Sequence, residues 1–195
     1  ACVMEPRLGY LEQNARAITV LVVVPNGYGT GILIAPDKVL TVNHLLVTDK
    51  VNVYFYEGTA LPISTTIPIV GEVIWRSDNI DLALLSISPT DISPAIVVCQ
   101  LPPIGTPIFI IGHSGLGIRW TVRYGNVAAS HLNSRDTLII YMTTSGGDSG
   151  AGVFNYDGKL IGIIVARQIS RLSGNDGFSF MIPGSKICEE LVNII

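Results

Sequence analysis

Short runs of β-branched and aromatic residues recur along the whole chain, separated by turn residues in stretches such as PNGYG, APDK and NYDG. Runs of this kind, with turns about every 8–12 residues, are typical of all-β sandwiches and barrels. The expected strands are ITVLVVV, GTGILIA, KVLTVNH, VNVYFYE, IVGEVIW, DLALLSI, PIFIIGH, GNVAAS, TLIIYM, AGVFN, KLIGIIVA and GFSFMIP. We expect a helix only in the C-terminal GSKICEELVNII, where Ile187, Leu191 and Ile194 would share one face.

A proline-rich segment divides these runs into two sets of about six. Central strands cannot hold so many prolines, so we interpret the segment as a connection between two halves. We therefore predict two small β-barrels in tandem, meeting along a cleft. The predicted units are an N-terminal arm (1–16), a first barrel (17–88), an inter-barrel linker (89–107), a second barrel (108–183) and a C-terminal helix (184–195).

The composition excludes several classes of protein. Hydrophobic residues make up 48% of the chain and charged residues only 14%, so the chain can bury a core and is not disordered. A net charge of −3 argues against a nucleic-acid partner, because phosphate binding requires a basic surface. No apolar run reaches the roughly 18–20 residues of a membrane span. These features predict a soluble, globular protein.

The cysteines and the N-terminus bear on the compartment. Cys2, Cys99 and Cys188 are an odd number far apart in sequence, which fits neither a disulfide framework nor a metal site. We expect each to be a small buried hydrophobe. The start ACVMEPRLGYLEQNAR lacks the pattern of a signal peptide. Together these features favour the cytoplasm, or the host cytoplasm if the protein is viral.

One stretch, TTSGGDSGAGVF, places a serine, Ser149, among four glycines between two strand-like runs. A hairpin turn needs fewer glycines, so the backbone N–H groups are expected to face an external partner. A serine hydroxyl becomes a nucleophile only beside a base that a third group holds in one tautomer. His44, at the end of an apolar strand, and Asp81, just before another, are the candidates for these two groups.

Together the segments GTGILIAPDKVLTVNH, DLALL and GGDSG, in the order His, Asp, Ser, resemble a chymotrypsin-like (trypsin-like) serine protease. The resemblance covers about Ile18 to Pro183. The segments DGKLIGI and GFSFMIP are most similar to the HtrA-like and glutamyl-endopeptidase-like branches of bacteria or viruses. The resemblance implies an all-β fold of two tandem six-stranded antiparallel β-barrels with the active site between them. No PDZ domain follows residue 195, so an HtrA-type regulatory cage is not expected from this sequence.

By this resemblance Ser149 attacks the scissile carbonyl, His44 transfers the proton, and Asp81 orients His44. The backbone N–H groups of Gly147 and Ser149 would form the oxyanion hole. Asp78 is the nearest competitor for the acid, but the family motif selects Asp81. Three other residues are expected to be structural or exposed: His113, His131, and Ser114, whose GHSGL lacks the second glycine of a nucleophile elbow.

The chain also departs from the family. Leu45 stands where secreted animal members carry a disulfide cysteine after the histidine. Asp148 precedes the nucleophile as in trypsin, but no IVGG-like start exists to pair with it, so we expect Asp148 to meet a side chain or to need a partner for ordering. The specificity pocket is expected to have Thr143 at its base, Gly177 on its wall, and Val165 to Arg167 along its rim.

A pocket of this composition favours cleavage after small or medium apolar residues; if Arg167 turned inward, an acidic residue would be favoured instead. The leading hypothesis is a serine endopeptidase, either a viral polyprotein-processing or a bacterial enzyme, that acts on protein or peptide substrates without metal or cofactor. The alternatives are a catalytically silent binding or scaffold module and a β-rich structural or coat protein. The natural substrate, the organism, the oligomeric state and the role of residues 1–16 stay open.

Overall fold

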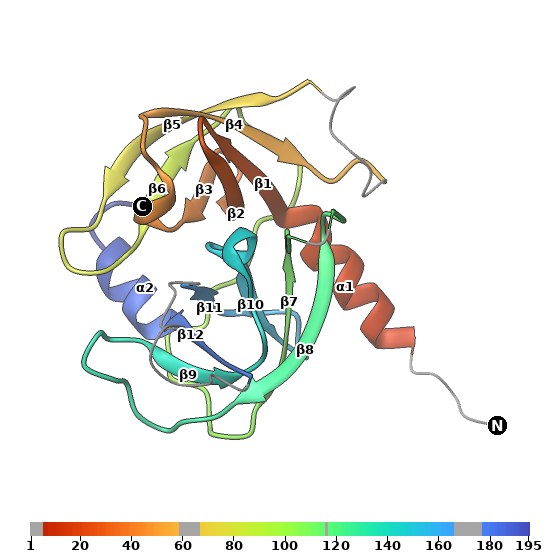
Figure 1. Ribbon diagram of the computed structural model, residues 1–195, viewed down its shortest axis with the longest axis vertical. Coiled ribbons are helices and arrows are strands. Elements are labelled where there is room, and N and C mark those ends of the chain that lie inside the picture. The colour runs from red at the N-terminus through yellow and green to blue at the C-terminus, as the bar shows by residue number, and fades with distance from the viewer. Residues whose placement is uncertain (1–5, 59–66, 116, 166–176) are drawn as a thin grey trace.

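Two closed six-stranded antiparallel barrels follow each other along the chain in the computed structural model (Figure 1). The structure describes residues 6–58, 67–115, 117–165 and 177–195. Each predicted run overlaps one of the strands, so the predicted all-β fold class is confirmed. Turn residues and β-branched residues were sufficient signals because both act locally along the chain.

The first barrel closes in the order β1-β2-β3-β6-β5-β4. Its strands are β1 (Thr19–Val24), β2 (Gly27–Ala35), β3 (Lys38–Thr41), β4 (Lys50–Phe55), β5 (Ile69–Arg76) and β6 (Ala83–Ser86). Two short connections of this barrel matter for the site. A 3-10 turn, η1 (Asn43–Leu45), follows β3, and the loop 77–82 joins β5 to β6.

The second barrel repeats the architecture in the order β10-β11-β12-β9-β8-β7. Its strands are β7 (Pro107–Gly112), β8 (Thr121–Val127), β9 (Leu138–Tyr141), β10 (Gly152–Asn155), β11 (Leu160–Ile164) and β12 (Phe178–Pro183). β7 pairs with the next strand, β8, as an antiparallel hairpin. A second 3-10 turn, η2 (Gly146–Asp148), lies between β9 and β10. The glycine-rich stretch is therefore a turn that projects from the barrel wall.

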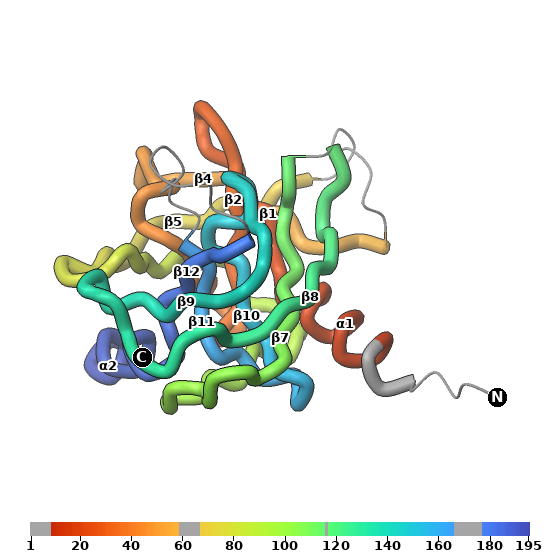
Figure 2. Tube along the Cα trace, turned by 60° about the horizontal axis from the view of Figure 1, so that its bottom comes forward, coloured from red at the N-terminus to blue at the C-terminus, as the bar shows by residue number. Residues whose placement is uncertain are grey.

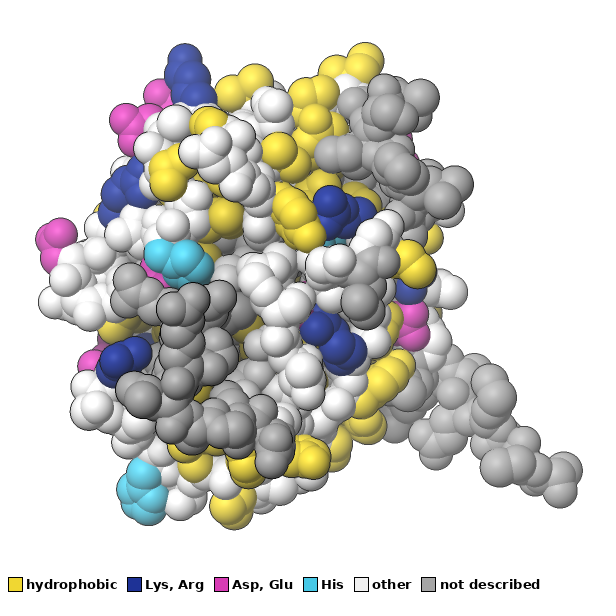
Figure 3. All heavy atoms as spheres, viewed as in Figure 1, with side chains coloured by type: hydrophobic (Ala, Val, Ile, Leu, Met, Phe, Trp, Pro, Cys, Tyr) yellow, Lys and Arg dark blue, Asp and Glu magenta, His cyan; other side chains and the backbone are white. Residues whose placement is uncertain are grey.

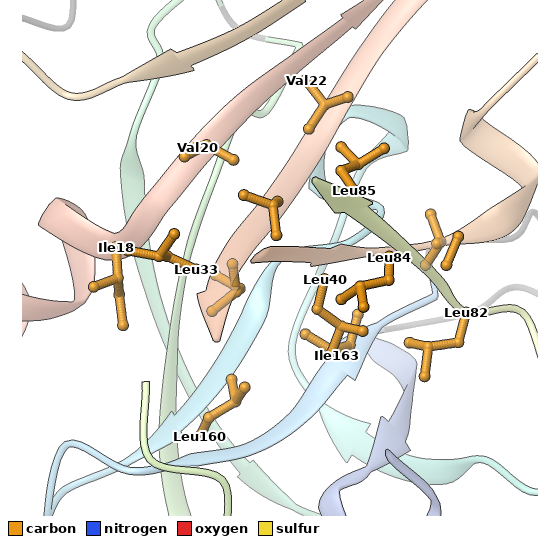
Figure 4. Close-up of a cluster of buried hydrophobic side chains, with 14 of the residues drawn as sticks. Ile18, Val20, Val22, Leu33, Leu40, Leu82, Leu84, Leu85, Leu160 and Ile163 are labelled. Atoms are coloured by element: carbon orange, nitrogen blue, oxygen red, sulfur yellow. The ribbon is translucent and has the colours of Figure 1, made fainter. Parts of the chain in front are cut away.

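The main hydrophobic core crosses the boundary between the barrels. Leu33, Leu40 and Leu84 of the first barrel are fully buried and belong to one cluster with Leu160 and Ile163 of the second (Figure 4). Burying one such side chain stabilises a fold by about 1.5–3 kcal/mol. A second cluster fills the interior of the second barrel. Because the larger cluster is shared, the two barrels are packed on one another rather than joined only by the linker.

Two helices lie on opposite sides of the barrels (Figures 1 and 2). The expectation of a single C-terminal helix is wrong, because α1 spans Pro6–Ile18 before the first strand. Proline is well suited to the first helical position, and Leu11, Ala15 and Ile18 have helical spacing and pack into the core.

The C-terminal helix was predicted correctly but ends earlier than expected. α2 spans Gly184–Leu191 and buries Ile187 and Leu191, whereas Ile194 lies beyond the helix and is 36% exposed. Neither α2 nor α1 is long and apolar enough to cross a membrane, and no other helix of the described residues is either.

The expectation that Cys99 and Cys188 are unpaired hydrophobes is wrong. They form a disulfide with a Cα–Cα distance of 5.7 Å that joins the inter-barrel connection to α2. Cys2 lies outside the described residues. The pairing could not be predicted from a sequence separation of 89, because spacing along the chain does not show which residues a barrel brings together. Because these two cysteines are paired, cysteine usage no longer favours the cytoplasm.

Candidate active site

His44 is held by Asp81 through two hydrogen bonds, one to its backbone and one to its imidazole. Asp81 Oδ1 accepts the backbone N–H of His44 at 2.8 Å, and Asp81 Oδ2 lies 2.5 Å from His44 Nδ1. Because a carboxylate only accepts, His44 presents its Nδ1 proton to Asp81 and leaves Nε2 free to act as a base. The predicted partnership of these two side chains is thus present in the structure.

The turn that carries His44 has a second anchor, which the sequence analysis missed. Arg76 Nη1 donates to Asn43 Oδ1 at 2.6 Å and to the carbonyl of Leu46 at 3.0 Å. These bonds bracket η1 on both sides of His44. The anchor comes from the end of β5, so no local motif could have revealed it.

Ser149 lies at the end of η2, where the first barrel holds the turn. The N–H of Thr30 in β2 donates to the Ser149 carbonyl at 2.8 Å, and Thr30 Oγ1 donates to the Gly147 carbonyl at 2.8 Å. Gly150 follows with a φ of +88°, and a Cβ there would lie 1.9 Å from the Thr30 carbonyl oxygen. Only glycine fits at this position. The nucleophile candidate, on the second barrel, is therefore fitted against the wall of the first.

The turns carrying His44 and Ser149 meet at Gly29. A Cβ on Gly29 would lie 2.5 Å from the side chain of Leu45, the neighbour of His44, and 3.0 Å from the Ser149 carbonyl oxygen. Absence of a side chain at Gly29 lets the two turns approach each other. The structure thus brings the turn that carries His44, which is bonded to Asp81, close to the turn that carries Ser149 at the junction of the barrels.

The predicted oxyanion hole is closed in this conformation. The N–H of Ser149 donates to the Gly146 carbonyl at 3.3 Å, and the N–H of Asp148 donates to the Ser145 carbonyl at 3.0 Å. These bonds make the 3-10 turn η2. One of the two N–H groups expected to bind an oxyanion is therefore already engaged within the turn.

Asp148, next to the nucleophile, meets a side chain as expected. Its carboxylate is fully buried, pairs with the guanidinium of Arg123 on β8, and accepts the Ser145 N–H at 2.7 Å and the Ser145 hydroxyl at 3.1 Å. Arg123 also donates to the Thr143 carbonyl at 3.3 Å. An internal arginine thus takes the place that a cleaved N-terminus occupies in trypsin-like relatives.

The predicted pocket residues are only partly described. Thr143 is exposed, and Val165 is 8% exposed and borders the cleft. Gly177 has a φ of +94° and packs against the ring of Tyr141. Arg167 lies outside the described residues. Two hydroxyls that the sequence analysis did not single out lie 2.9 Å apart: that of Thr144, which follows β9, and that of Ser179 on β12.

A cleft of about 560 Å³ borders the His44–Asp81 pair. One wall is the loop 77–81 of the first barrel, and the other includes residues 133–137, Phe180 and Ile182 of the second. On the face shown in Figure 3, the described Lys and Arg side chains lie apart and form no continuous patch. The lining therefore combines polar loop atoms with the apolar side chains of Val165, Phe180 and Ile182, which suits an extended peptide better than a polyanion.

Two other residues fall outside this chemistry. His113 is fully buried against the ring of Trp120, and the backbone N–H of Trp120 donates to His113 Nδ1 at 3.2 Å. Burial lowers the pKa of His113 from 6.5 to about 3, with a smaller contribution from the charge of Arg119. Ser114 lies in the β7–β8 connection, 3.3 Å from the Thr121 hydroxyl. In the described part of the chain, no group of His, Cys, Asp or Glu is arranged to hold a metal ion.

Comparison with known protein sequences finds that the chain is similar to serine proteases. Serine protease Rv3671c of Mycobacterium tuberculosis H37Rv is 25% identical over 180 residues, with 85% of this chain and 42% of that protein covered. A probable periplasmic serine protease do/HhoA-like of Haemophilus influenzae is 28% identical over 171 residues, with 82% of this chain and 35% of that protein covered. The chain thus spans less than half the length of these relatives.

Solved structures share the fold. The active form of Rv3671c protease superposes with a TM-score of 0.79 at 20% identity, covering 98% of this chain and 85% of that one. The serine endoprotease from Yersinia pestis superposes with a TM-score of 0.74 at 21% identity, covering 95% of this chain and 66% of that one. The sequence profile of the trypsin-like peptidase domain matches residues 29–163, more than half of the chain. The predicted resemblance is confirmed, and the chain belongs to the trypsin-like peptidase domain family.

Proposed function

We propose that the chain is a serine endopeptidase in which Ser149, His44 and Asp81 form the catalytic triad. The observation that carries this proposal is the double attachment of Asp81 to His44, through the backbone N–H at 2.8 Å and through Nδ1 at 2.5 Å. A purely structural ion pair would not need to fix the ring orientation. A general base does, because its free nitrogen must face the nucleophile.

The chemistry follows from this orientation. His44 Nε2 removes the proton of the Ser149 hydroxyl as the oxygen attacks the scissile carbonyl, and the resulting imidazolium is stabilised by Asp81. His44 then gives the proton to the leaving amine as the C–N bond breaks, which leaves an acyl-enzyme on Ser149. Water, deprotonated by His44, hydrolyses the ester and restores the hydroxyl.

The oxyanion hole must open for this reaction. The N–H of Ser149 is bonded to the Gly146 carbonyl in the closed turn, so rotation of the peptide between Gly146 and Gly147 is required. The rotation removes the carbonyl and aims the Gly147 N–H outward. Glycine at both positions keeps the barrier to such a rotation low. We infer that a bound substrate favours the open form, since one oxyanion donor contributes about 3–4 kcal/mol in the transition state.

The pocket chemistry supports cleavage after small or medium apolar residues. Thr144 and Ser179 bond to each other, and Ser179 also donates to the Met142 carbonyl at 2.5 Å, so both hydroxyls are already hydrogen-bonded. Arg123 is engaged with Asp148 and the Thr143 carbonyl. Thr144, Ser179 and Arg123 therefore offer no free charge to a substrate side chain, and Arg167 is the predicted pocket residue that would favour an acidic one.

Labelling with a fluorophosphonate tests the activity. We expect one adduct on Ser149 in the wild-type protein, and its loss in both Ser149→Ala and His44→Ala. A peptide library then reports the residue preferred before the cleaved bond. Intact-mass spectra without any adduct on folded wild-type protein, together with no library cleavage, would exclude the endopeptidase.

A second candidate, the catalytically silent binding module, has one observation in its favour. The closed turn with the Ser149 N–H bonded to Gly146 is the conformation that such a module could keep permanently. The two candidates differ in a peptide titration. Substrate-like peptides terminating in an aldehyde would form a hemiacetal with Ser149 of an enzyme, whereas a silent module would bind them without covalent change.

The disulfide supports a location outside a reducing cytoplasm. Disulfides persist in oxidising compartments, and Cys99–Cys188 joins two segments of the described structure. We propose that the chain works in such a compartment. Thiol trapping of protein taken directly from its native cells would test this, because free Cys99 and Cys188 there would contradict it.

A further inference from the structure

The loop that leads to Asp81 is attached to the last helix through one carboxylate. Glu190 Oε2 accepts the hydroxyl of Ser77 at 2.6 Å, and Glu190 Oε1 accepts the side-chain amide of Asn79 at 3.1 Å. The sequence separations are 113 and 111 residues. These contacts join α2, which follows the second barrel, to the β5–β6 loop of the first barrel. None of these residues belongs to the family motifs found in the sequence.

Ser77 transmits the position of Glu190 to the rest of the loop. Ser77 is 7% exposed, and its oxygen accepts the backbone N–H groups of Asn79 and Ile80, each at 3.1 Å. The same hydroxyl gives its proton to Glu190. A serine with this arrangement bends the backbone locally, and the acceptor of its proton fixes the direction of that bend. Asp81 follows Ile80 directly.

Glu190 itself projects from a rigid support. Its neighbours Ile187 and Leu191 are buried at 0% and 4% exposure, and Cys188 is tied to Cys99 by the disulfide. The carboxylate is thus a fixed point against which a loop can be aligned. Glu189, one residue earlier, is different: it pairs with Lys186 at 2.9 Å on the surface and has no contact with the loop among the hydrogen bonds of the described residues.

We propose that Glu190 is a positioning residue that aligns Asp81 with His44 and holds one wall of the substrate cleft. The loop 77–81 borders that cleft, and both hydrogen bonds that Asp81 accepts from His44 depend on where the loop places the carboxylate. The inference rests on the proposed endopeptidase activity, since alignment has a chemical consequence only if His44 is a base. A displacement of about 1 Å far from the reacting atoms can lower turnover by up to about 100-fold.

The test compares Glu190→Ala, Glu190→Gln and the matched control Glu189→Ala at a temperature where circular dichroism finds all variants folded. The rate constant for labelling by a small fluorophosphonate is the main measurement. Such a reagent reaches Ser149 without filling the cleft, so its rate reports how well the hydroxyl is activated. We expect a loss of at least about 10-fold in Glu190→Ala and wild-type behaviour in Glu189→Ala.

Glu190→Gln separates hydrogen bonding from charge. Its oxygen can still accept from Ser77, and its amide can donate to Asn79 once the Asn79 amide turns over. We therefore expect Glu190→Gln to recover most of the labelling rate lost in Glu190→Ala.

Three results have distinct meanings. Wild-type protein that neither labels nor cleaves peptides defeats the proposed function itself. Active wild type with folded Glu190→Ala labelling at the same rate overturns the positioning role. A Glu190→Gln variant as slow as Glu190→Ala also overturns it, because charge rather than the two hydrogen bonds would then be responsible.

Discussion

Replacing Arg123 by methionine leaves the buried carboxylate of Asp148 without its cation. Methionine keeps much of the length of the arginine stem and removes all of its hydrogen-bond donors. Asp148 retains the N–H and the hydroxyl of Ser145, at 2.7 and 3.1 Å, but it stays fully buried. The variant therefore isolates the contribution of the Arg123–Asp148 ion pair to stability and to the turn beside Ser149.

The cost follows from burial on the two sides of the pair. Removing one partner of a buried ion pair typically costs about 3–5 kcal/mol. The Arg123 side chain is 25% exposed, so water can reach the vacated space, and Ser145 continues to compensate part of the charge. We expect a loss of about 2–3 kcal/mol, which lowers the thermal midpoint of a chain of this length by about 4–12 °C.

Differential scanning calorimetry of four proteins measures this effect: wild type, Arg123→Met, the double variant Arg123→Met/Asp148→Asn, and Lys50→Met as an exposed control on β4. The double variant should regain most of the stability, because it has no uncompensated charge while the asparagine oxygen still accepts from Ser145. A stabilising role of the ion pair is refuted if Arg123→Met melts within about 1 °C of wild type, or if the double variant is no more stable than the single one.

Two further predictions concern stability. Reducing the Cys99–Cys188 disulfide, whose ends are 89 residues apart, should cost about 4–5 kcal/mol by loop entropy, and urea unfolding with and without a reductant measures it; an unchanged midpoint would contradict the prediction. His113 has a folded-state pKa of about 3 against 6.5 in the unfolded chain, so the unfolded state binds the extra proton between these values. Stability should therefore fall by about 1.4 kcal/mol per pH unit as the pH drops below 6.5 towards 3. The urea midpoint of His113→Asn should change less with pH than that of wild type across this range. Equal pH dependence in the two proteins would refute the assignment of this effect to His113.

The two barrels could be predicted because their signals are local. Strand-forming residues and turn residues act within a few positions of each other, and the same holds for the glycine turn around Ser149. The helix α1 carried a local signal too, with Leu11, Ala15 and Ile18 at helical spacing, but the short, polar-rich segment was interpreted as an arm.

The rest of the site could not be predicted because it depends on distant pairs. Arg123 meets Asp148 across 25 residues, and Glu190 meets Ser77 across 113. Any surface arginine or glutamate in the chain has the same local appearance as these two. Local context made His44, Asp81 and Ser149 candidates, and a family motif, which records the result of folding, grouped them as one predicted site. The residues that support them have no such record.

The two bonds from Thr30 to the turn around Ser149 impose an order on maturation. Ser149 lies in a later part of the chain than β2, whose Thr30 holds the backbone of the turn in place. A separately produced half, residues 107–195, would carry Ser149 without these two hydrogen bonds from Thr30. The proposed activity of Ser149 would therefore arise only after both halves have docked.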